Sequence, residues 1–366
     1  MAKKTLNNSL PHPPELYKFF TQTLLRWNLD QNQRKMPWKG EKDPYKIWLS
    51  EVMLQQTRVE QGMAYYNRFV EQFPNVTALA VAKDEKVFKL WEGLGYYSRC
   101  RNLLETARYI AFECGGIFPD NYASLLKLKG VGPYTAAAIA SFAFNLQHAV
   151  VDGNVFRVIA RYMGIDEAID THKGKQVFTE LANGLLDKKT PGIYNQAIMD
   201  FGATICKPAL PLCSKCVLQK KCIAIKAGTV NQLPVKTKTI LRKNRWMYYF
   251  IFICKNAAGI RQRIHKDIWQ GLFEFYLFES EKMIHWDEAA INGWLQTQLK
   301  IKGAKIKNIS SVHQQQLTHQ QITGQFIQIE LKSVPESLAG LDWVNSRQMQ
   351  QLAFPKLITQ YLEGGL

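Results

Sequence analysis

LLKLKGVGPYTAAAIASFAF, at residues 125–144, is the stretch of this sequence that decides the fold. A segment with helical spacing leads into the turn Gly130-Val131-Gly132, and an alanine-rich helical segment follows it. Glycine permits positive φ and a close approach of the backbone. The N–H groups of such a turn, together with those of the next helix's first turn, can hold an anion. The stretch predicts a helix-hairpin-helix at about residues 122–144 that grips a phosphate through backbone amides; a plain structural turn is the alternative.

Helical periodicity continues on both sides of this hairpin. In residues 45–59, for example, apolar side chains recur at helical spacing after a proline, a residue favoured in the first helical turn. Glycine and proline mark the joints between such segments, and we find no convincing set of strands among them. We therefore predict an all-α domain at residues 15–225, preceded by a short flexible tail at residues 1–14.

The sequence changes in character after Cys222. Residues 226–244 are polar and basic and are predicted to form a linker. Trp246–Lys255, WMYYFIFICK, is rich in aromatic and β-branched residues, which is typical of a strand. Further strand and helix patterns alternate after it, and Ser346–Leu362 is predicted to be a closing helix. We predict an α/β domain with a mixed sheet at residues 245–366.

The net charge of +17 is unevenly distributed along the chain. Between Phe201 and Lys266 there is no Asp or Glu, whereas fourteen Lys and Arg residues occur. Such a stretch repels itself unless it meets a polyanion, so we interpret it as a nucleic-acid-binding surface; a solvated linker surface is the alternative. The tail lacks the apolar core of a signal peptide, and no apolar run approaches the ~18 residues of a membrane span. We expect a cytoplasmic protein, associated with the nucleoid if bacterial, with no membrane partner.

Four of the seven cysteines crowd into seventeen residues with the spacing C-x6-C-x2-C-x5-C. They are Cys206, Cys213, Cys216 and Cys222. In a chain without a secretion signal, such a group indicates a metal site and not disulfides. Structural zinc usually has two C-x2-C pairs, and a [4Fe–4S] cluster also takes four cysteines, so the spacing favours iron–sulfur and leaves zinc open. The other cysteines are predicted to be core residues.

Two carboxylates are candidate catalytic groups. Glu51, in SEVMLQQT, follows Ile47 and Trp48 at helical spacing and so lies on the apolar stripe of its helix. Burial there would raise its pKa toward neutrality, which suits a general acid; a charge at the edge of the stripe, or paired with an arginine, is the alternative. Asp152, in VVDGNV, precedes a helical segment, where it is either a simple N-cap or an anion held beside a developing cation. The sequence alone does not show that the two carboxylates meet.

The hairpin, the VDGNV motif and the four-cysteine loop, in this order, resemble the endonuclease III and MutY superfamily of DNA glycosylases over about residues 15–225. The stretches SEVMLQQT, GLGYYSR, GVGPYTAAAIASFAF and VDGNVFRVIAR carry the resemblance. It implies that residues 206–222 hold a [4Fe–4S] cluster. Bifunctional members carry a lysine that forms a Schiff base at the position of Tyr134, so this chain resembles the monofunctional, MutY-type adenine DNA glycosylases.

The resemblance also implies roles for individual residues. Glu51 protonates the adenine, Asp152 stabilises the oxocarbenium-like sugar, and Tyr134 and Asn154 line the pocket, in keeping with the paired carboxylates of glycoside hydrolysis. The implied partner is double-stranded DNA in which adenine is mispaired with 8-oxoguanine or guanine; the adenine is flipped out of the duplex, and the enzyme acts as a monomer. The implied DNA-binding positions in this part of the chain are Gln56, Leu94, Tyr96, Gly130 and Gly132.

The C-terminal part resembles the Nudix-like 8-oxoguanine recognition domain of the same family, on the segment Gly271–Phe275, GLFEF. We find no Glu-rich Nudix box, so pyrophosphate hydrolysis is not expected. The recognition loop of the family is typically Phe-Ser-His, and the matching stretch here is Leu317-Thr318-His319. Thr318 can replace the serine of the family's loop as a hydroxyl donor, and His319 is expected to keep the role of the family's histidine. Leu317 cannot stack as phenylalanine does.

Two other functions stay open on the sequence. An endonuclease III-like glycosylase/lyase for damaged pyrimidines is opposed by Tyr134 and by the long C-terminal domain. A non-catalytic DNA-binding protein that keeps the hairpin and the cluster is opposed by the presence of both Glu51 and Asp152, because phosphate binding needs neither acid.

Overall fold

The computed structural model describes residues 12–237 and 241–364, which form two compact units. The first unit comprises Met1–Ala80 and Glu105–Lys238, and the second comprises Val81–Leu104 and Thr239–Leu366. Among the helices of the described residues, none has both the length and the apolar character that crossing a membrane requires.

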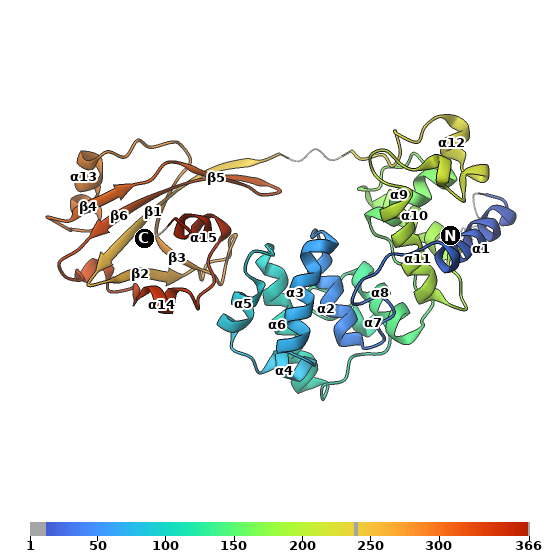
Figure 1. The fold of residues 1–366 in the computed structure, drawn as a ribbon, viewed down its shortest axis with the longest axis horizontal. Helices are drawn as coiled ribbons and strands as arrows, with labels where there is room; N and C mark the ends of the chain where they lie inside the picture. Colours follow the sequence, from blue (N-terminus) through green and yellow to red (C-terminus); the bar gives the residue numbers. More distant parts are fainter. Residues whose placement is uncertain (1–11, 238–240, 365–366) are drawn as a thin grey trace, which may run out of the picture. The chain divides into compact units, whose positions relative to one another are not determined.

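The first unit is helical, which confirms the predicted all-α character of this part (Figure 1). Its longer helices are α1 (Pro14–Asp30), α2 (Pro44–Leu54), α3 (Val59–Gln72), α8 (Pro133–Phe144), α9 (Gly153–Met163), α10 (His172–Leu185) and α11 (Pro191–Thr204). Its shorter elements are α4 (Val76–Ala80), the π-helical turn η1 (Tyr109–Glu113), α7 (Tyr122–Leu125), the 3-10 turns η2 (Cys213–Lys215) and η3 (Gln219–Lys221), and α12 (Ile223–Ala227). The helix α5 (Asp84–Trp91) belongs to the second unit, and α6 (Tyr97–Arg108) is divided between the two.

Local chemistry sets the start of the helix that carries Glu51. Asp43 caps α2 by accepting a hydrogen bond from the backbone N–H of Tyr45, and Pro44 occupies the first turn, where its missing N–H has no cost. Eight of the residues in α2 are buried, Glu51 among them. A helix enclosed on most sides carries any acidic residue on it into a poorly solvated environment.

The alanine-rich sequence of α8 follows from its position inside the first unit. Residues 135–141 of this helix are all buried, and it packs against both α2 and α11. Small side chains at such contacts shorten the distance between helix axes. The first turn of α8, with Tyr134, therefore lies close to the helix that carries Glu51.

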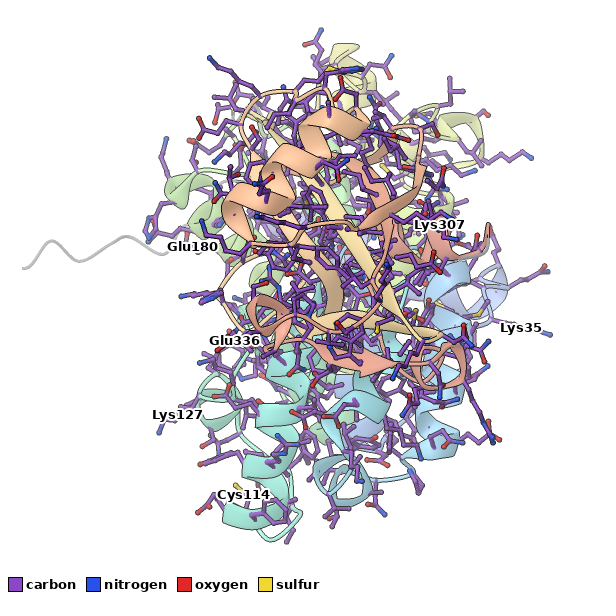
Figure 2. The ribbon with its side chains drawn as sticks, turned by 90° about the vertical axis from the view of Figure 1, so that its left-hand side faces the viewer. Lys35, Cys114, Lys127, Glu180, Lys307 and Glu336 are labelled. Carbon is purple, nitrogen blue, oxygen red and sulfur yellow. The ribbon has the colours of Figure 1, made fainter. Side chains whose placement is uncertain are left out.

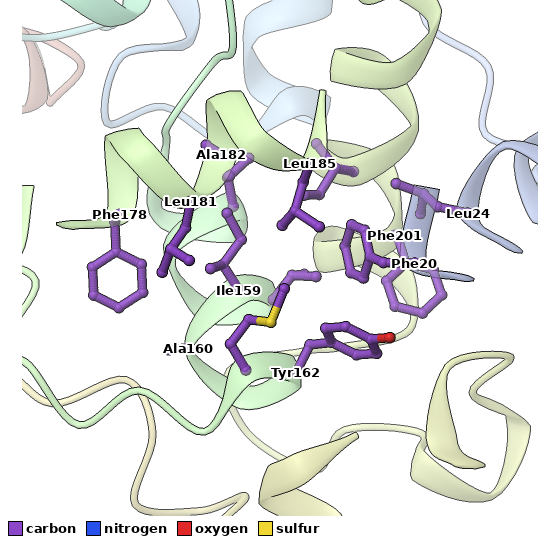
Figure 3. Packing of buried hydrophobic residues seen from close by; sticks show 14 of the residues in the cluster. Phe20, Leu24, Ile159, Ala160, Tyr162, Phe178, Leu181, Ala182, Leu185 and Phe201 are labelled. Atoms are coloured by element: carbon purple, nitrogen blue, oxygen red, sulfur yellow. The ribbon is translucent and has the colours of Figure 1, made fainter. Parts of the chain in front are cut away.

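A core of buried side chains joins α1, α9, α10 and α11 (Figure 3). Phe20 of α1 contacts Tyr162 of α9 with 4.7 Å between ring centroids, and Trp27 meets Phe201 of α11 edge to face at 4.9 Å. Such aromatic pairs add about 0.5–1.5 kcal/mol each beyond the burial of their area. The core holds α9 in place, and Asp152 caps the first turn of that helix.

The second unit contains a seven-stranded sheet with the order β4-β6-β1-β3-β2-β7, in which β5 also pairs with β6. The strands are β1 (Lys243–Cys254), β2 (Ala257–Gln262), β3 (Phe273–Ser280), β4 (Lys305–Ile309), β5 (His313–Gln316), β6 (Gln320–Glu330) and β7 (Asp342–Val344). The central pair β1 and β6 is parallel and the other pairs are antiparallel. This confirms the predicted mixed sheet.

Helices cover both faces of this sheet. Side chains alternate between the faces of a strand, and along β1 Tyr248 and Phe250 pack in the same cluster as Ile291 of α13 (Glu288–Gln298). The intervening Tyr249 stacks on Phe326, which in turn stacks on Tyr361 of α15 (Lys356–Leu362). The helices α13 and α15 therefore lie on opposite faces.

The predicted single helix at Ser346–Leu362 is wrong. The structure has two helices there, α14 (Ser346–Met349) and α15, separated by residues 350–355. Pro355 is the cause, because proline disfavours the helical conformation in the residue before it and begins α15 as its N-cap. Helical periodicity does not register this break, since Leu357 and Tyr361 keep the spacing.

Candidate active site

Glu51 lies on α2 with only 6% of its surface exposed. Burial raises the pKa of its carboxyl to about 7. A hydrogen bond with the Tyr134 hydroxyl opposes this rise in pKa, and the negative charge of Asp152 adds to it. A carboxyl with a pKa near 7 carries a proton on a large share of molecules at neutral pH and can transfer it, as a general acid must.

Tyr134 stands in the first turn of α8, directly after Pro133. Its hydroxyl is hydrogen-bonded with Glu51 and lies 3.4 Å from the sulfur of Met199. Burial raises the pKa of Tyr134 well above its usual value, and the charges of Glu51 and Asp152 add to the rise. The phenol therefore stays protonated and can orient the carboxyl, but it offers no amine for a Schiff base.

Asp152 is the N-cap of α9. One carboxylate oxygen accepts from the backbone N–H of Val155 at 2.8 Å, and the other accepts from Asn154 Nδ2 at 2.7 Å. Burial raises the pKa of Asp152, and these hydrogen bonds lower it in part. The N-cap interpretation is thus confirmed, and the carboxylate is also close enough to Glu51 to raise the pKa of that residue. The structure brings the four predicted catalytic positions into one site.

Arg157 is a residue that the sequence reasoning missed. It is 7% exposed, and its guanidinium donates to Asn154 Oδ1 at 2.8 Å and to the backbone carbonyls of Gly153, Gly202 and Cys206 at 3.1, 2.8 and 2.7 Å. One side chain therefore connects the cysteine loop to the amide that holds Asp152. The sequence did contain a signal for Arg157: it is a charged residue on the apolar stripe of α9, three positions after Asn154.

Replacing Arg157 with methionine should destabilise the protein. Four oxygens lose their donor, and an unsatisfied buried acceptor costs about 1–3 kcal/mol; with partial entry of water we expect a loss of about 3 kcal/mol in the free energy of unfolding. Denaturant titration measures this difference. The matched control is Arg26→Met, an exposed arginine on α1, which should change stability by less than about 0.5 kcal/mol. Equal stability of the two variants would contradict the role given to Arg157.

A cavity of about 150 Å³ lies beside Glu51. Aromatic and aliphatic side chains line it together with polar and charged ones, and polar groups of this kind fix the orientation of a small ligand in a pocket. The lining includes Trp38, Lys39, Ser50, Glu51, Phe142, Ile193 and Gln196. Of the four predicted catalytic residues only Glu51 is in this lining, and the predicted pocket residues Tyr134 and Asn154 are not. The sequence reasoning missed the other lining residues, because they come from α2, α8, α11 and the loop before α2, and no motif marks Gln196.

The four predicted metal ligands line one small cavity in the first unit. The cavity is otherwise lined mainly by apolar side chains and has Arg161 as its charged neighbour. Arg161 donates to Cys206 Sγ at 3.5 Å and to the backbone carbonyls of Lys207 and Pro208 at 2.7 and 3.1 Å. Among the described residues, no three His, Cys, Asp or Glu side chains converge as ligands of a single metal ion would.

The hairpin places its two glycines differently. Gly130 has a φ of +74°, which side chains rarely adopt. Gly132 is the N-cap of α8 with a φ of −92°, and a Cβ there would meet no atom within 4 Å. Both glycines are exposed, and the nearby Lys127 projects into solvent (Figure 2). The turn therefore presents backbone N–H groups and a lysine at the surface of the first unit.

The remaining predicted DNA-binding residues fall in two places. Gln56 lies in the first unit, exposed between α2 and α3 with a φ of +57°. In the second unit, Leu94, Tyr96, Thr318 and His319 line one cavity of about 470 Å³. The hydroxyls of Tyr96 and Thr318 are hydrogen-bonded to each other. The structure thus joins the GLGYYSR stretch with the predicted recognition loop.

Comparison with known proteins gives the class. The model of the HhH-GPD superfamily of base excision DNA repair proteins matches residues 49–183, and that of the NUDIX domain matches residues 248–364. The solved structure of a thermostable thymine-DNA glycosylase is 31% identical, with a TM-score of 0.54 over 58% of this chain and 98% of that chain. The helical fold and these matches define a helix-hairpin-helix base excision repair protein.

Relatives along the whole length give the family. The adenine DNA glycosylase of Buchnera aphidicola subsp. Acyrthosiphon pisum (strain APS) is 32% identical over 349 residues, which are 94% of this chain and 97% of that protein. The chain belongs to the adenine DNA glycosylase family. The adenine DNA glycosylase of Mus musculus is 43% identical over 227 residues, which are 59% of this chain and 44% of that protein.

Proposed function

We propose that this protein is a monofunctional DNA glycosylase that hydrolyses the N-glycosidic bond of adenine mispaired with 8-oxoguanine or guanine. The observation that carries the proposal is the buried Glu51, which is hydrogen-bonded with Tyr134 and has its pKa raised further by the charge of Asp152. Membership of the adenine DNA glycosylase family supports the substrate class. A substrate of this kind also places the protein at the chromosomal DNA of its cell.

The proposed reaction uses the two carboxyls in different protonation states. Glu51 donates its proton to a ring nitrogen of the flipped adenine, the C1′–N9 bond breaks, and its electron pair leaves with the base. Asp152 stays ionised and stabilises the positive charge that develops on the sugar. A water then attacks C1′ and gives up a proton, which restores the acid. This division of roles is that of paired carboxyls in glycoside hydrolysis.

The cavity beside Glu51 is the proposed site of the flipped base. The aromatic ring of Trp38 and the proposed general acid Glu51 both line it. Flipping costs a few kcal/mol of stacking and pairing, which the pocket contacts must offset. In the second unit, the cavity that contains Tyr96, Thr318 and His319 is proposed to recognise the 8-oxoguanine left in the duplex.

The test is single-turnover excision on a duplex with one adenine opposite 8-oxoguanine, quenched with and without hot alkali. Release of adenine with strand breaks that appear mainly after alkali supports a monofunctional glycosylase. Breaks without alkali would favour the glycosylase/lyase, and binding without release would favour the DNA-binding protein. A duplex with adenine opposite thymine is the matched control, which should be processed far more slowly.

We also propose that the cysteine loop holds a [4Fe–4S] cluster. Its donors are all thiols and line one small, mainly apolar cavity, which fits a cluster with four cysteine ligands, whereas structural zinc usually has two C-x2-C pairs. Cys206, Cys213, Cys216 and Cys222 would hold the cluster, and it would cross-link the loop. The lysines of the loop would then face the phosphate backbone; they are Lys207, Lys215, Lys220 and Lys221.

Replacing Cys213 with serine should lower the iron content from about four atoms per chain to nearly none. Because the loop then loses its cross-link, the variant should also unfold at a lower temperature than the parent protein. Iron and sulfide analysis with thermal unfolding measures both effects. Cys114→Ser, outside the loop, should keep the iron. Zinc in place of iron in the parent protein would refute the cluster.

A further inference from the structure

Asp200 is a buried acid that the proposed reaction does not use. It lies on α11 with 0% of its surface exposed. Its carboxylate accepts from four side chains, namely Asn32 Nδ2 at 2.9 Å, an Arg34 Nη at 2.9 Å, Lys39 Nζ at 3.0 Å and Gln196 Nε2 at 3.0 Å. Ion pairs with Arg34 and Lys39 compensate its charge.

Gln196 connects Asp200 to the cavity beside Glu51. It stands one helical turn before Asp200 on α11 and lines that cavity. A carboxylate only accepts hydrogen bonds, so the amide must turn its nitrogen toward Asp200. A rotated amide would set its oxygen against a carboxylate oxygen and lose a charge-assisted hydrogen bond. The amide oxygen is therefore the atom that is left to face the cavity.

Lys39 is held by the same carboxylate. This lysine also lines the cavity, and its ammonium donates to Asp200 and to the backbone carbonyl of Arg34 at 3.0 Å. A free ammonium at the wall would favour a ligand with an exocyclic oxygen. Asp200 therefore acts on two lining residues: it occupies one N–H of the Lys39 ammonium and fixes the orientation of the Gln196 amide.

We propose that Asp200 is a positioning residue for base specificity, which makes the cavity accept a purine with a 6-amino group and reject one with a 6-oxo group. The amide oxygen of Gln196 accepts from the exocyclic amine of adenine, in line with the preference of glutamine for this base, and opposes the exocyclic oxygen of hypoxanthine. A site with a committed hydrogen-bonding group discriminates strongly against a base that leaves it unpaired. This inference rests on the proposed function, because it takes the cavity as the site of the flipped base.

The experiment compares single-turnover release of adenine and of hypoxanthine, each opposite 8-oxoguanine. In Asp200→Asn the residue at 200 can face the Gln196 amide in either orientation, so the ratio of adenine to hypoxanthine rates should fall by about tenfold or more. Asn32→Ala is the matched control, because it removes a donor to one carboxylate oxygen and leaves the Gln196 bond to the other; its ratio should stay that of the parent. Loss of folding or of acid catalysis slows both bases together and leaves the ratio unchanged.

A second variant keeps the inference testable if Asp200→Asn does not fold. Gln196→Met keeps a side chain of similar size without the amide, and its ratio should fall as far as that of Asp200→Asn. The role of Asp200 would be overturned if Gln196→Met kept the parent's ratio of adenine to hypoxanthine release rates. It would also be overturned if this ratio fell equally in Asp200→Asn and Asn32→Ala. If the parent protein releases neither base, the proposed function itself fails, which is a separate result.

Discussion

Replacing Glu51 with glutamine is expected to slow adenine release by about 10²- to 10⁴-fold, the range that a positioned general acid contributes. Glutamine has nearly the same shape and can still accept from the Tyr134 hydroxyl, but it has no proton to give. Affinity for DNA should stay within a few-fold, because Glu51 is buried and far from being a surface contact. Single-turnover excision and equilibrium DNA binding measure the two quantities. A variant that excises at the parent rate would remove Glu51 from the proposed role.

The pH dependence of the parent protein should follow the same carboxyl. Burial raises the pKa of Glu51 to about 7. The charge of Asp152 adds to this rise, and the hydrogen bond from Tyr134 opposes it. The acid form is therefore present below pH 7, and the rate should fall by about tenfold per pH unit above it. The residual rate of Glu51→Gln should lack this decline. A parent rate that stays level from pH 6 to pH 8.5 would contradict proton donation by this residue.

The raised pKa also predicts that ionised Glu51 lowers the free energy of unfolding. The folded state binds the Glu51 proton more tightly than the unfolded state does, so stability is lost as pH rises from about 4.5 to 7. The shift corresponds to about 3 kcal/mol at 1.36 kcal/mol per pKa unit. At pH 8, Glu51→Gln should therefore be more stable than the parent by up to about 3 kcal/mol, with little difference at pH 4. Denaturant unfolding at both pH values tests this, and a gain in stability with a loss of activity is typical of catalytic residues.

Residues whose environment depends on their own helix could be predicted from the sequence. The spacing of Glu51 from Ile47 and Trp48 placed it on an apolar stripe, and α2 does bury it. The glycine turn before α8 is also local, and so is the change after Cys222 from a helical to an alternating hydrophobic pattern. The structure has the helical part and the mixed α/β part that these patterns predict. These features need no knowledge of which elements pack together.

The rest of the site depends on packing between elements, which one sequence does not contain. Asp152 comes close enough to Glu51 to raise its pKa because α8 lies against α2 and α11, and α11 lies against α9. Gly202 shows the same limit: a Cβ there would lie 2.7 Å from the Cβ of Asn154, a constraint between α11 and α9 that no motif records. The bonds from Arg157 to the cysteine loop, and those from Gln196 to Asp200, likewise appear only in three dimensions.

Replacing Asp152 with asparagine is expected to slow excision by about 10²- to 10³-fold, the effect of removing one preorganised electrostatic contact to a transition state. The structure makes this variant informative, because Asp152 has two roles that the change separates. Asparagine is as good an N-cap as aspartate and can still accept from the backbone N–H of Val155. It loses the negative charge and one hydrogen bond, that from Asn154, which costs about 1 kcal/mol of stability.

The two interpretations of Asp152 therefore predict different results. If the residue only caps α9, Asp152→Asn keeps turnover and loses only the hydrogen bond from Asn154, whereas Asp152→Ala loses the cap as well and is less stable than Asp152→Asn by about 1 kcal/mol. If it also stabilises the cationic sugar, Asp152→Asn loses turnover with the same small loss of about 1 kcal/mol of stability, while DNA binding stays close to that of the parent. The same variant separates catalysis from DNA binding, because a charge that serves only the transition state can be removed without weakening the contacts to phosphate. Parent-like excision by Asp152→Asn would leave Glu51 as the only acid of the reaction and would require another source of charge beside the sugar.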